Sequence, residues 1–221
     1  MAADAHDGAL HAVASALLND GKYVEAWEHA SPLFDESTPR WETKALAARI
    51  MLEWSKADGD EERLHSSVEA FDEALRLLRA EAADAARTAE LVELENDRGV
   101  ALYELHSLDE ARRAFERTLE LDSEHGRALS NMGLVNWAEG HERIALSNFD
   151  KAIACGDNLQ HAHNNRGALL VQLGQEQKAL TDFHAALALN PSYEAARRNR
   201  DGALAALEQP VPLQPANDEP F

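Results

Sequence analysis

Asparagine side chains recur at a fixed interval in the C-terminal half of the chain. Asn131, Asn165 and Asn199 are 34 residues apart, and Asp97 lies one interval before the first of them. An amide side chain carries both hydrogen-bond donors and an acceptor. It can therefore bond to the backbone N–H and C=O groups of another polypeptide, whatever the side chains of that polypeptide are. A row of amides suits an extended peptide.

Polar and basic residues accompany this asparagine row. Asn96 and Asn164 directly precede two of its members, while Arg127 and Arg198 add fixed positive charge. A guanidinium group forms paired hydrogen bonds with a carboxylate, so the two arginines suit a free peptide C-terminus or acidic side chains. The row also has a second interpretation, in which the amides complete hydrogen bonds between neighbouring helices. The sequence leaves both interpretations open.

No pattern in the sequence indicates a reaction centre. His161 and His163, with His125 nearby, could suggest a metal site, but residues at i and i+2 of a helix point about 200° apart. The sequence contains no glycine-rich phosphate loop, nucleophile elbow or pair of zinc cysteines. We therefore expect no catalytic residues, no metal and no cofactor, and a protein that is not an enzyme.

Repeated helical hairpins are the elements that must position the asparagine row. Glycine, alanine and phenylalanine share its interval. They are Gly99, Gly133 and Gly167; Ala111, Ala145 and Ala179; and Phe115, Phe149 and Phe183. Small residues let the two helices of a hairpin cross closely, and the phenylalanine ring fills the space beside the crossing. Gly140 and Gly174 suit left-handed helix ends between the two helices, where the first copy has His106.

This pattern resembles the tetratricopeptide repeat (TPR), a helical hairpin of about 34 residues. The three copies span 92–125, 126–159 and 160–193. Glycine, alanine and phenylalanine match the family in every copy, and its proline is matched by Pro191. The resemblance implies an all-α fold, a right-handed α-solenoid of stacked antiparallel helix hairpins. It also implies that the first helices line a concave groove, with the asparagine row and Asp97 facing into it.

Some TPR proteins hold the C-terminal tails of chaperones with a clamp of Lys, Arg and Asn at set repeat positions. Of that clamp, this chain matches only Asn131. The other positions hold Asn96, Val100, His161 and Asn165. The resemblance therefore does not imply this clamp. Tyr103 and its equivalents in the next two copies either form an apolar strip for a partner or pack against the next hairpin.

The rest of the chain carries the repeat less regularly. We expect one copy over 7–40 and a degenerate copy with a longer turn over 41–81. A C-terminal capping helix over 194–208 closes the stack, because a terminal unit needs a polar outer face. The units form a single TPR-like solenoid domain over 1–208. The segment 209–221 contains four prolines and is expected to be a disordered tail.

The chain of 221 residues is strongly acidic, with a net charge of −19. Such a chain is repelled by nucleic-acid phosphates and by anionic membranes, so we expect neither as a partner. Basic polypeptides are favoured. The single Cys155 excludes an intrachain disulfide. The N-terminus lacks the apolar run of a signal peptide, and no stretch is long enough to span a bilayer. The cytoplasm is the expected location.

These observations predict a protein–protein interaction module that binds an extended polypeptide segment in its concave groove. The partner is a protein or peptide that is basic or has a free C-terminus. The expected binding residues are Asn131, Asn165, Asn199, Asp97, Asn96, Asn164, Arg127 and Arg198. Two other functions stay open, a dedicated secretion or assembly chaperone that holds a client protein and a self-assembling structural scaffold. The sequence does not determine the oligomeric state.

Overall fold

The structure, a computed structural model, describes residues 2–34, 40–81, 87–156 and 159–208. Within these ranges all regular structure is helical. The helices are α1 (Ala2–Asn19), α2 (Tyr23–Ala30), the 3-10 turn η1 (Ser31–Leu33), α3 (Trp41–Asp58), α4 (Glu61–Glu81), α5 (Thr88–Glu104), α6 (Leu108–Leu121), α7 (Gly126–Ala138), α8 (Glu142–Cys155), α9 (Leu159–Gln172), α10 (Glu176–Leu189) and α11 (Glu194–Glu208). The tail expected over 209–221 lies outside the described residues. No helix in the described ranges is both long and apolar enough to cross a membrane.

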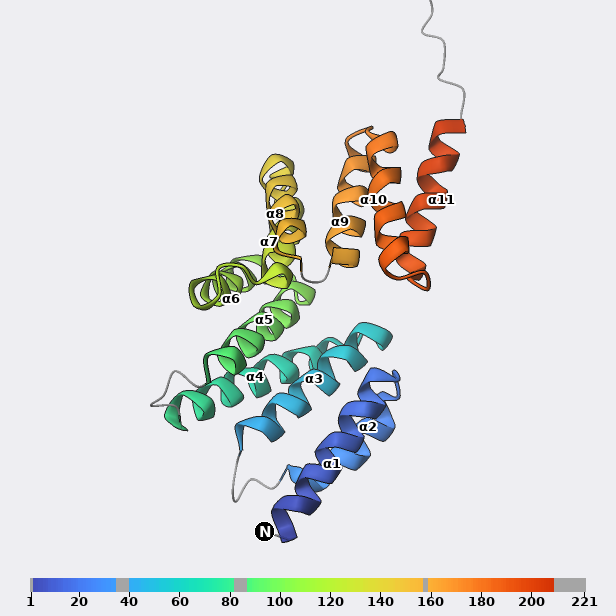
Figure 1. Cartoon of the computed structure of the whole chain (residues 1–221). Helices are drawn as coiled ribbons and strands as arrows, with labels where there is room; N and C mark the ends of the chain where they lie inside the picture. Colours follow the sequence, from blue (N-terminus) through green and yellow to red (C-terminus); the bar gives the residue numbers. More distant parts are fainter. Residues whose placement is uncertain (1, 35–39, 82–86, 157–158, 209–221) are drawn as a thin grey trace, which may run out of the picture.

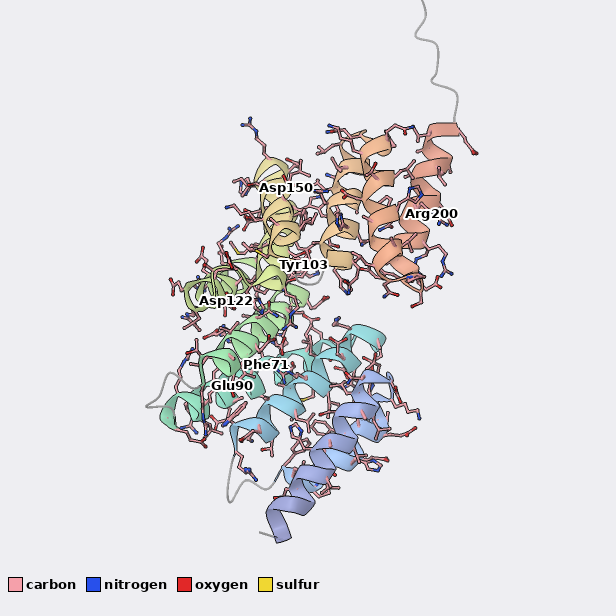
Figure 2. The ribbon with its side chains drawn as sticks, in the orientation of Figure 1. Phe71, Glu90, Tyr103, Asp122, Asp150 and Arg200 are labelled. Atoms are coloured by element: carbon pink, nitrogen blue, oxygen red, sulfur yellow. The ribbon has the colours of Figure 1, made fainter. Side chains whose placement is uncertain are left out.

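Successive helices pack as hairpins, from α1 and α2 at one end of the molecule to the closing helix α11 at the other (Figure 1). Each hairpin contacts the next, and the first helices α3, α5, α7, α9 and α11 also contact one another in order. This is the all-α solenoid that the sequence predicts. Asp122 on the turn after α6 and Asp150 on α8 are among the exposed charged residues (Figure 2).

A close contact between glycine and phenylalanine holds each C-terminal hairpin together. A Cβ atom added at Gly133 would lie 2.5 Å from Cε1 of Phe149. The same distance is 2.5 Å at Gly99 with Phe115 and 2.7 Å at Gly167 with Phe183. Each ring is fully buried, as are the repeated alanines. The predicted close crossing of the two helices is therefore confirmed.

The turns between paired helices share one backbone geometry. Gly140 and Gly174 have φ of +77° and +68°, and His106 reaches +57° at the same place in the first copy. The residue after each of them donates its backbone N–H to a carbonyl near the end of the first helix. The bonds run from Ser107 to Leu102 at 2.9 Å, from His141 to Asn136 at 2.8 Å and from Gln175 to Leu170 at 2.8 Å. The turn after α1 has the same bond, from Lys22 to Leu17 at 2.9 Å.

The N-terminal hairpins continue the stack with helices of different lengths. The second hairpin consists of α3 and α4, with 18 and 21 residues, against 14 in α6, α8, α9 and α10. Inside it the buried Ser67 hydroxyl donates to the Ala48 carbonyl at 2.9 Å. One buried cluster, including Leu52, Leu75 and Leu94, joins this hairpin to α5. As a result α3 lies beside α5 and extends the row of first helices.

Candidate functional site

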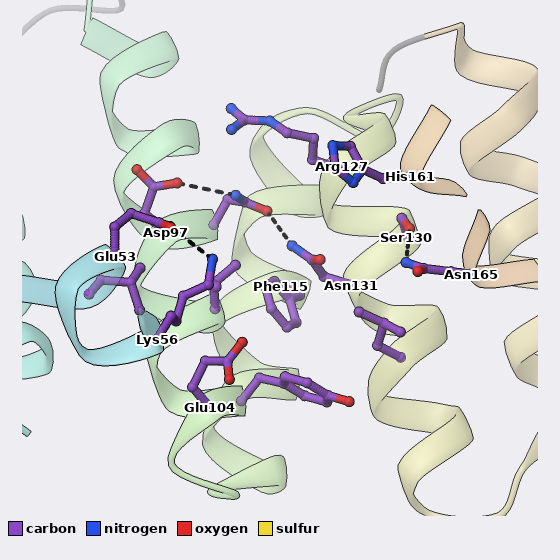
Figure 3. Close-up of a pocket in the computed structure, with 15 residues that line it drawn as sticks. Glu53, Lys56, Asp97, Glu104, Phe115, Arg127, Ser130, Asn131, His161 and Asn165 are labelled. Atoms are coloured by element: carbon purple, nitrogen blue, oxygen red, sulfur yellow. Dashed lines mark hydrogen bonds and ion pairs between the residues drawn. The ribbon is translucent and has the colours of Figure 1, made fainter. Parts of the chain in front are cut away.

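A groove with a volume of 470 Å³ opens along the first helices of four successive hairpins (Figure 3). Its walls come from α3, α5, α7 and α9, with Phe115 of α6 at its base. A second hollow of 470 Å³ shares Leu52, Glu53, Asp97 and Arg127 with it and continues to the turn between α1 and α2. The hollows therefore follow the row of first helices.

Each asparagine of the row donates a hydrogen bond to the preceding first helix. The bonds run from Asn131 Nδ2 to Asn96 Oδ1 at 3.1 Å, from Asn165 Nδ2 to Ser130 Oγ at 3.5 Å and from Asn199 Nδ2 to Asn164 Oδ1 at 2.9 Å. The three acceptor side chains are buried. The row thus does link neighbouring helices, the second of the two interpretations open from the sequence.

This bracing leaves hydrogen-bonding capacity on the groove side. Asn131 is only partly buried, and its Oδ1 accepts no hydrogen bond from any described residue. The amide also keeps a second N–H after donating to Asn96. Asn131 and Asn165 both line the groove (Figure 3). The same amide can therefore bond to the preceding helix and still have atoms left to bond to a peptide.

Most charged residues of the groove have a partner of opposite charge, either in the groove or beside it. Arg49 donates to Asp97 with Nε and Oδ2 2.6 Å apart. Arg127 pairs with Glu93 of the preceding hairpin, although the sequence suggested a free cation there. His125 approaches the same carboxylate, with Nε2 3.5 Å from Glu93 Oε1. A carboxylate ligand would have to compete with Glu93 for Arg127.

His125 and Arg127 together perturb the ionisation of Glu93. Hydrogen bonding by His125, with that of Arg127, lowers the pKa of Glu93 to about 2, although partial burial opposes the shift. The Nδ1 atom of His125 accepts from the Ala128 N–H at 3.2 Å and caps α7. The proton of the neutral ring therefore lies on Nε2, which faces Glu93. The contact links α5, the first helix of one hairpin, to the start of α7 in the next.

The structure gathers most of the predicted binding residues at one place. Those that line the groove are Asn96, Asp97, Arg127, Asn131 and Asn165. The other three, Asn164, Asn199 and Arg198, lie nearer the C-terminal end of the stack and do not border this groove. Arg198 is exposed on α11.

Sequence analysis missed the wall formed by α3. Leu52, Glu53 and Lys56 line the groove there, and Lys56 Nζ lies 2.9 Å from Glu53 Oε1. The N-terminal half lacks the register of the later copies, so repeat position could not assign these residues to the groove. It also missed Glu104 of α5, which lines the same hollow.

The histidines that could have suggested a metal site have separate partners. His161 Nδ1 lies 2.9 Å from the Tyr193 hydroxyl, and burial lowers the pKa of His161. His163 Nδ1 lies 2.7 Å from Asp182. In the part of the chain that the structure describes, no three His, Cys, Asp or Glu side chains are grouped so that they could hold a metal.

Comparison with known proteins identifies the repeat. The model of the tetratricopeptide repeat family matches residues 162–193, which include most of α9 and all of α10. The chain carries a tetratricopeptide repeat, and its fold is that of TPR proteins. A thermophilic TPR protein of Thermus thermophilus, TTC0263, is 17% identical, with 90% of this chain and 99% of that chain covered and a TM-score of 0.70. No curated protein matches this TPR protein.

A smaller TPR structure resembles part of the stack. The first TPR of Spaghetti (RPAP3), bound to the HSP90 peptide SRMEEVD, is 19% identical, with a TM-score of 0.50. It covers 54% of this TPR protein, and 95% of that chain is matched. At these identities the likeness concerns the fold.

Proposed function

We propose that this TPR protein is an interaction module that holds an extended segment of a partner polypeptide in the groove along α3, α5, α7 and α9. The observation that carries the proposal is the position of Asn131 and Asn165. Both line the groove, and both are held in place by bonds to the neighbouring helix. An amide that is already ordered loses little conformational freedom when a peptide binds, so more of its hydrogen-bond energy contributes to affinity.

The pairing of charges favours recognition of backbone over capture of a free C-terminus. Arg127 is engaged by Glu93, and Lys56 by Glu53. Backbone N–H and C=O groups need only the unbonded amide atoms of the row. The HSP90 peptide on the Spaghetti TPR supports a polypeptide as the kind of partner that this fold accepts.

The experiment starts from a library of randomised dodecapeptides displayed on phage and selected on the full chain. The affinity of a selected peptide is then measured by fluorescence polarisation for Asn131→Ala, Asn165→Ala and Asn199→Ala. We expect each of the first two changes to weaken binding by about 1–2 kcal/mol, the cost typical of a lost hydrogen bond in an interface.

Asn199→Ala is the matched control. It removes the same type of bond between first helices, at 2.9 Å, but Asn199 does not border the groove. Circular dichroism and thermal unfolding of all three variants measure the effect of the lost brace by itself. If affinity falls equally in the three variants, or merely follows their melting temperatures, the amides only brace the stack and the proposal fails.

A further inference from the structure

We infer that the groove contains a subsite for one lysine or arginine side chain of the bound polypeptide, formed by Glu104 and Tyr103 of α5. This inference rests on the proposed function, because it assigns one side chain of the peptide held there. It depends on the balance of charge in the groove, a tyrosine hydroxyl group that bonds to no described residue, and the shape of the walls.

Glu104 is the carboxylate that the groove leaves unbalanced. Glu53 pairs with Lys56 at 2.9 Å, Asp97 with Arg49 at 2.6 Å, and Arg127 with Glu93. Within the described ranges, Glu104 makes no ion pair and no side-chain hydrogen bond. It is also the last residue of α5, where the helix dipole disfavours a negative charge. A cation bound beside Glu104 would balance its charge and reduce the unfavourable interaction with the helix dipole.

Tyr103 adds a polar group without a partner. In the next hairpin the equivalent Trp137 donates from Nε1 to Gln172 Oε1 at 2.8 Å. The residue one interval before Gln172, which would face Tyr103, is Ala138, and alanine has no side-chain acceptor. Its hydroxyl group accordingly makes no hydrogen bond to any described residue. Burial, with the charge of Glu104 as a smaller cause, raises the pKa of Tyr103, so the hydroxyl stays protonated.

The walls around these groups suit a long cationic side chain. Leu52, Val100 and Leu134 line the same hollow as Tyr103 and Glu104. The methylene chain of lysine or arginine packs on such apolar walls while its charged end stays polar. An ammonium or guanidinium group gains from an aromatic face and from a carboxylate. Figure 3 shows Glu104 on the side of the hollow where Lys56 lies, with Asn131 across from it.

The subsite does not recur in the two copies that follow it. The residues at the place of Glu104 in the next two copies are Ala138 and Gln172, which carry no charge. The amide row repeats along the groove and would accept a peptide in several registers. A single subsite for a cation selects one of them, which gives this residue a function in specificity.

The test uses the phage selection on the full chain. We expect the selected peptides to share Lys or Arg at one position. Glu104→Gln should weaken the binding of such a peptide about tenfold. Replacing the arginine of the peptide with citrulline, its neutral analogue, should weaken binding by about the same factor. The two changes together should cost little more than either alone, because they remove the same contact.

Glu116→Gln is the control for charge. Glu116 is exposed on α6, outside the groove, and the change alters the net charge equally. An equal loss in this variant would overturn the subsite, since the effect would then be one of total charge. Peptides that depend on Asn131 but share no basic residue, or ignore Glu104→Gln, would overturn the subsite and leave the proposed function intact. Failure to select any peptide would overturn both.

Discussion

Asn131 offers one amide to two neighbours, a buried asparagine on the preceding helix and the open side of the groove. Its Nδ2 is 3.1 Å from Asn96 Oδ1, while its own carbonyl oxygen has no partner in the described ranges. The interval of the row could be predicted from the sequence. Whether each amide reaches the next helix depends on the spacing between helices, and residue types alone do not determine that spacing.

Arg127 is a second residue whose contacts could not be predicted from the sequence. Its position in the groove followed from the repeat register, but its partner Glu93 occupies the same repeat position one copy earlier. Two opposite charges one interval apart meet because the hairpins stack with little offset. The repeat register places Arg127 in the groove but does not show that Glu93 is near enough to pair with it.

The pairing of Glu93 gives a prediction for stability against pH. Since the folded-state pKa of about 2 lies below the ordinary value of 4.5 for a glutamate, ionised Glu93 stabilises the fold above about pH 4.5. That contribution is lost as pH falls from 4.5 towards 2. Because the side chain is 41% exposed, we expect it to be worth under about 1 kcal/mol. Urea unfolding of the wild type and Glu93→Gln should give free energies that differ at pH 7 and converge as the pH approaches 2. A difference that stays constant with pH would contradict the assignment.

At the scale of elements, the hairpin depends on contact between a glycine and a ring. Gly133→Ala would place a methyl group 2.5 Å from the buried ring of Phe149. Overpacking costs about 1–3 kcal/mol, and the gain in helix propensity returns about 1 kcal/mol. We therefore expect a net destabilisation of up to about 2 kcal/mol, measured by urea unfolding.

Gly202→Ala is the control for that substitution. Gly202 also lies within a helix, α11, but a Cβ atom there would meet nothing within 4 Å. Only the gain in propensity remains, so we expect stabilisation by up to about 1 kcal/mol. Destabilisation of similar size in both variants would mean that the glycine–phenylalanine contact is not the cause.

The N-terminal hairpins mark where prediction from the sequence loses accuracy. Helices were expected there, but α1 begins at Ala2 and α5 at Thr88, ahead of the repeat starts at 7 and 92. Two small residues, Ala48 and Ser67, are buried there together with the ring of Phe71. The later copies bury the same kinds of residue. The longer helices shift these residues out of the 34-residue register, so the interval that identified the later copies could not align them.

At the scale of the whole molecule, the described helices pack mainly against the next one or two helices in the chain. Substantial contacts join consecutive helices and successive first helices. Stability in such an array is close to a sum of local terms. We expect Gly167→Ala to raise amide hydrogen exchange in α9, α10 and the helices beside them, and to leave α3 and α4 protected. Uniform acceleration along the chain would show instead that the array unfolds as one unit.

The amide bonds between first helices also affect how the molecule bends. Among the described helices, the first helices contact one another in series, whereas α4, α6, α8 and α10 make no comparable contacts with one another. The concave side therefore resists extension, and a change in curvature must be taken up mainly by spreading of the convex side. The array can therefore bend while the length of the groove stays nearly constant. A peptide held there would stay in register during thermal bending of the molecule.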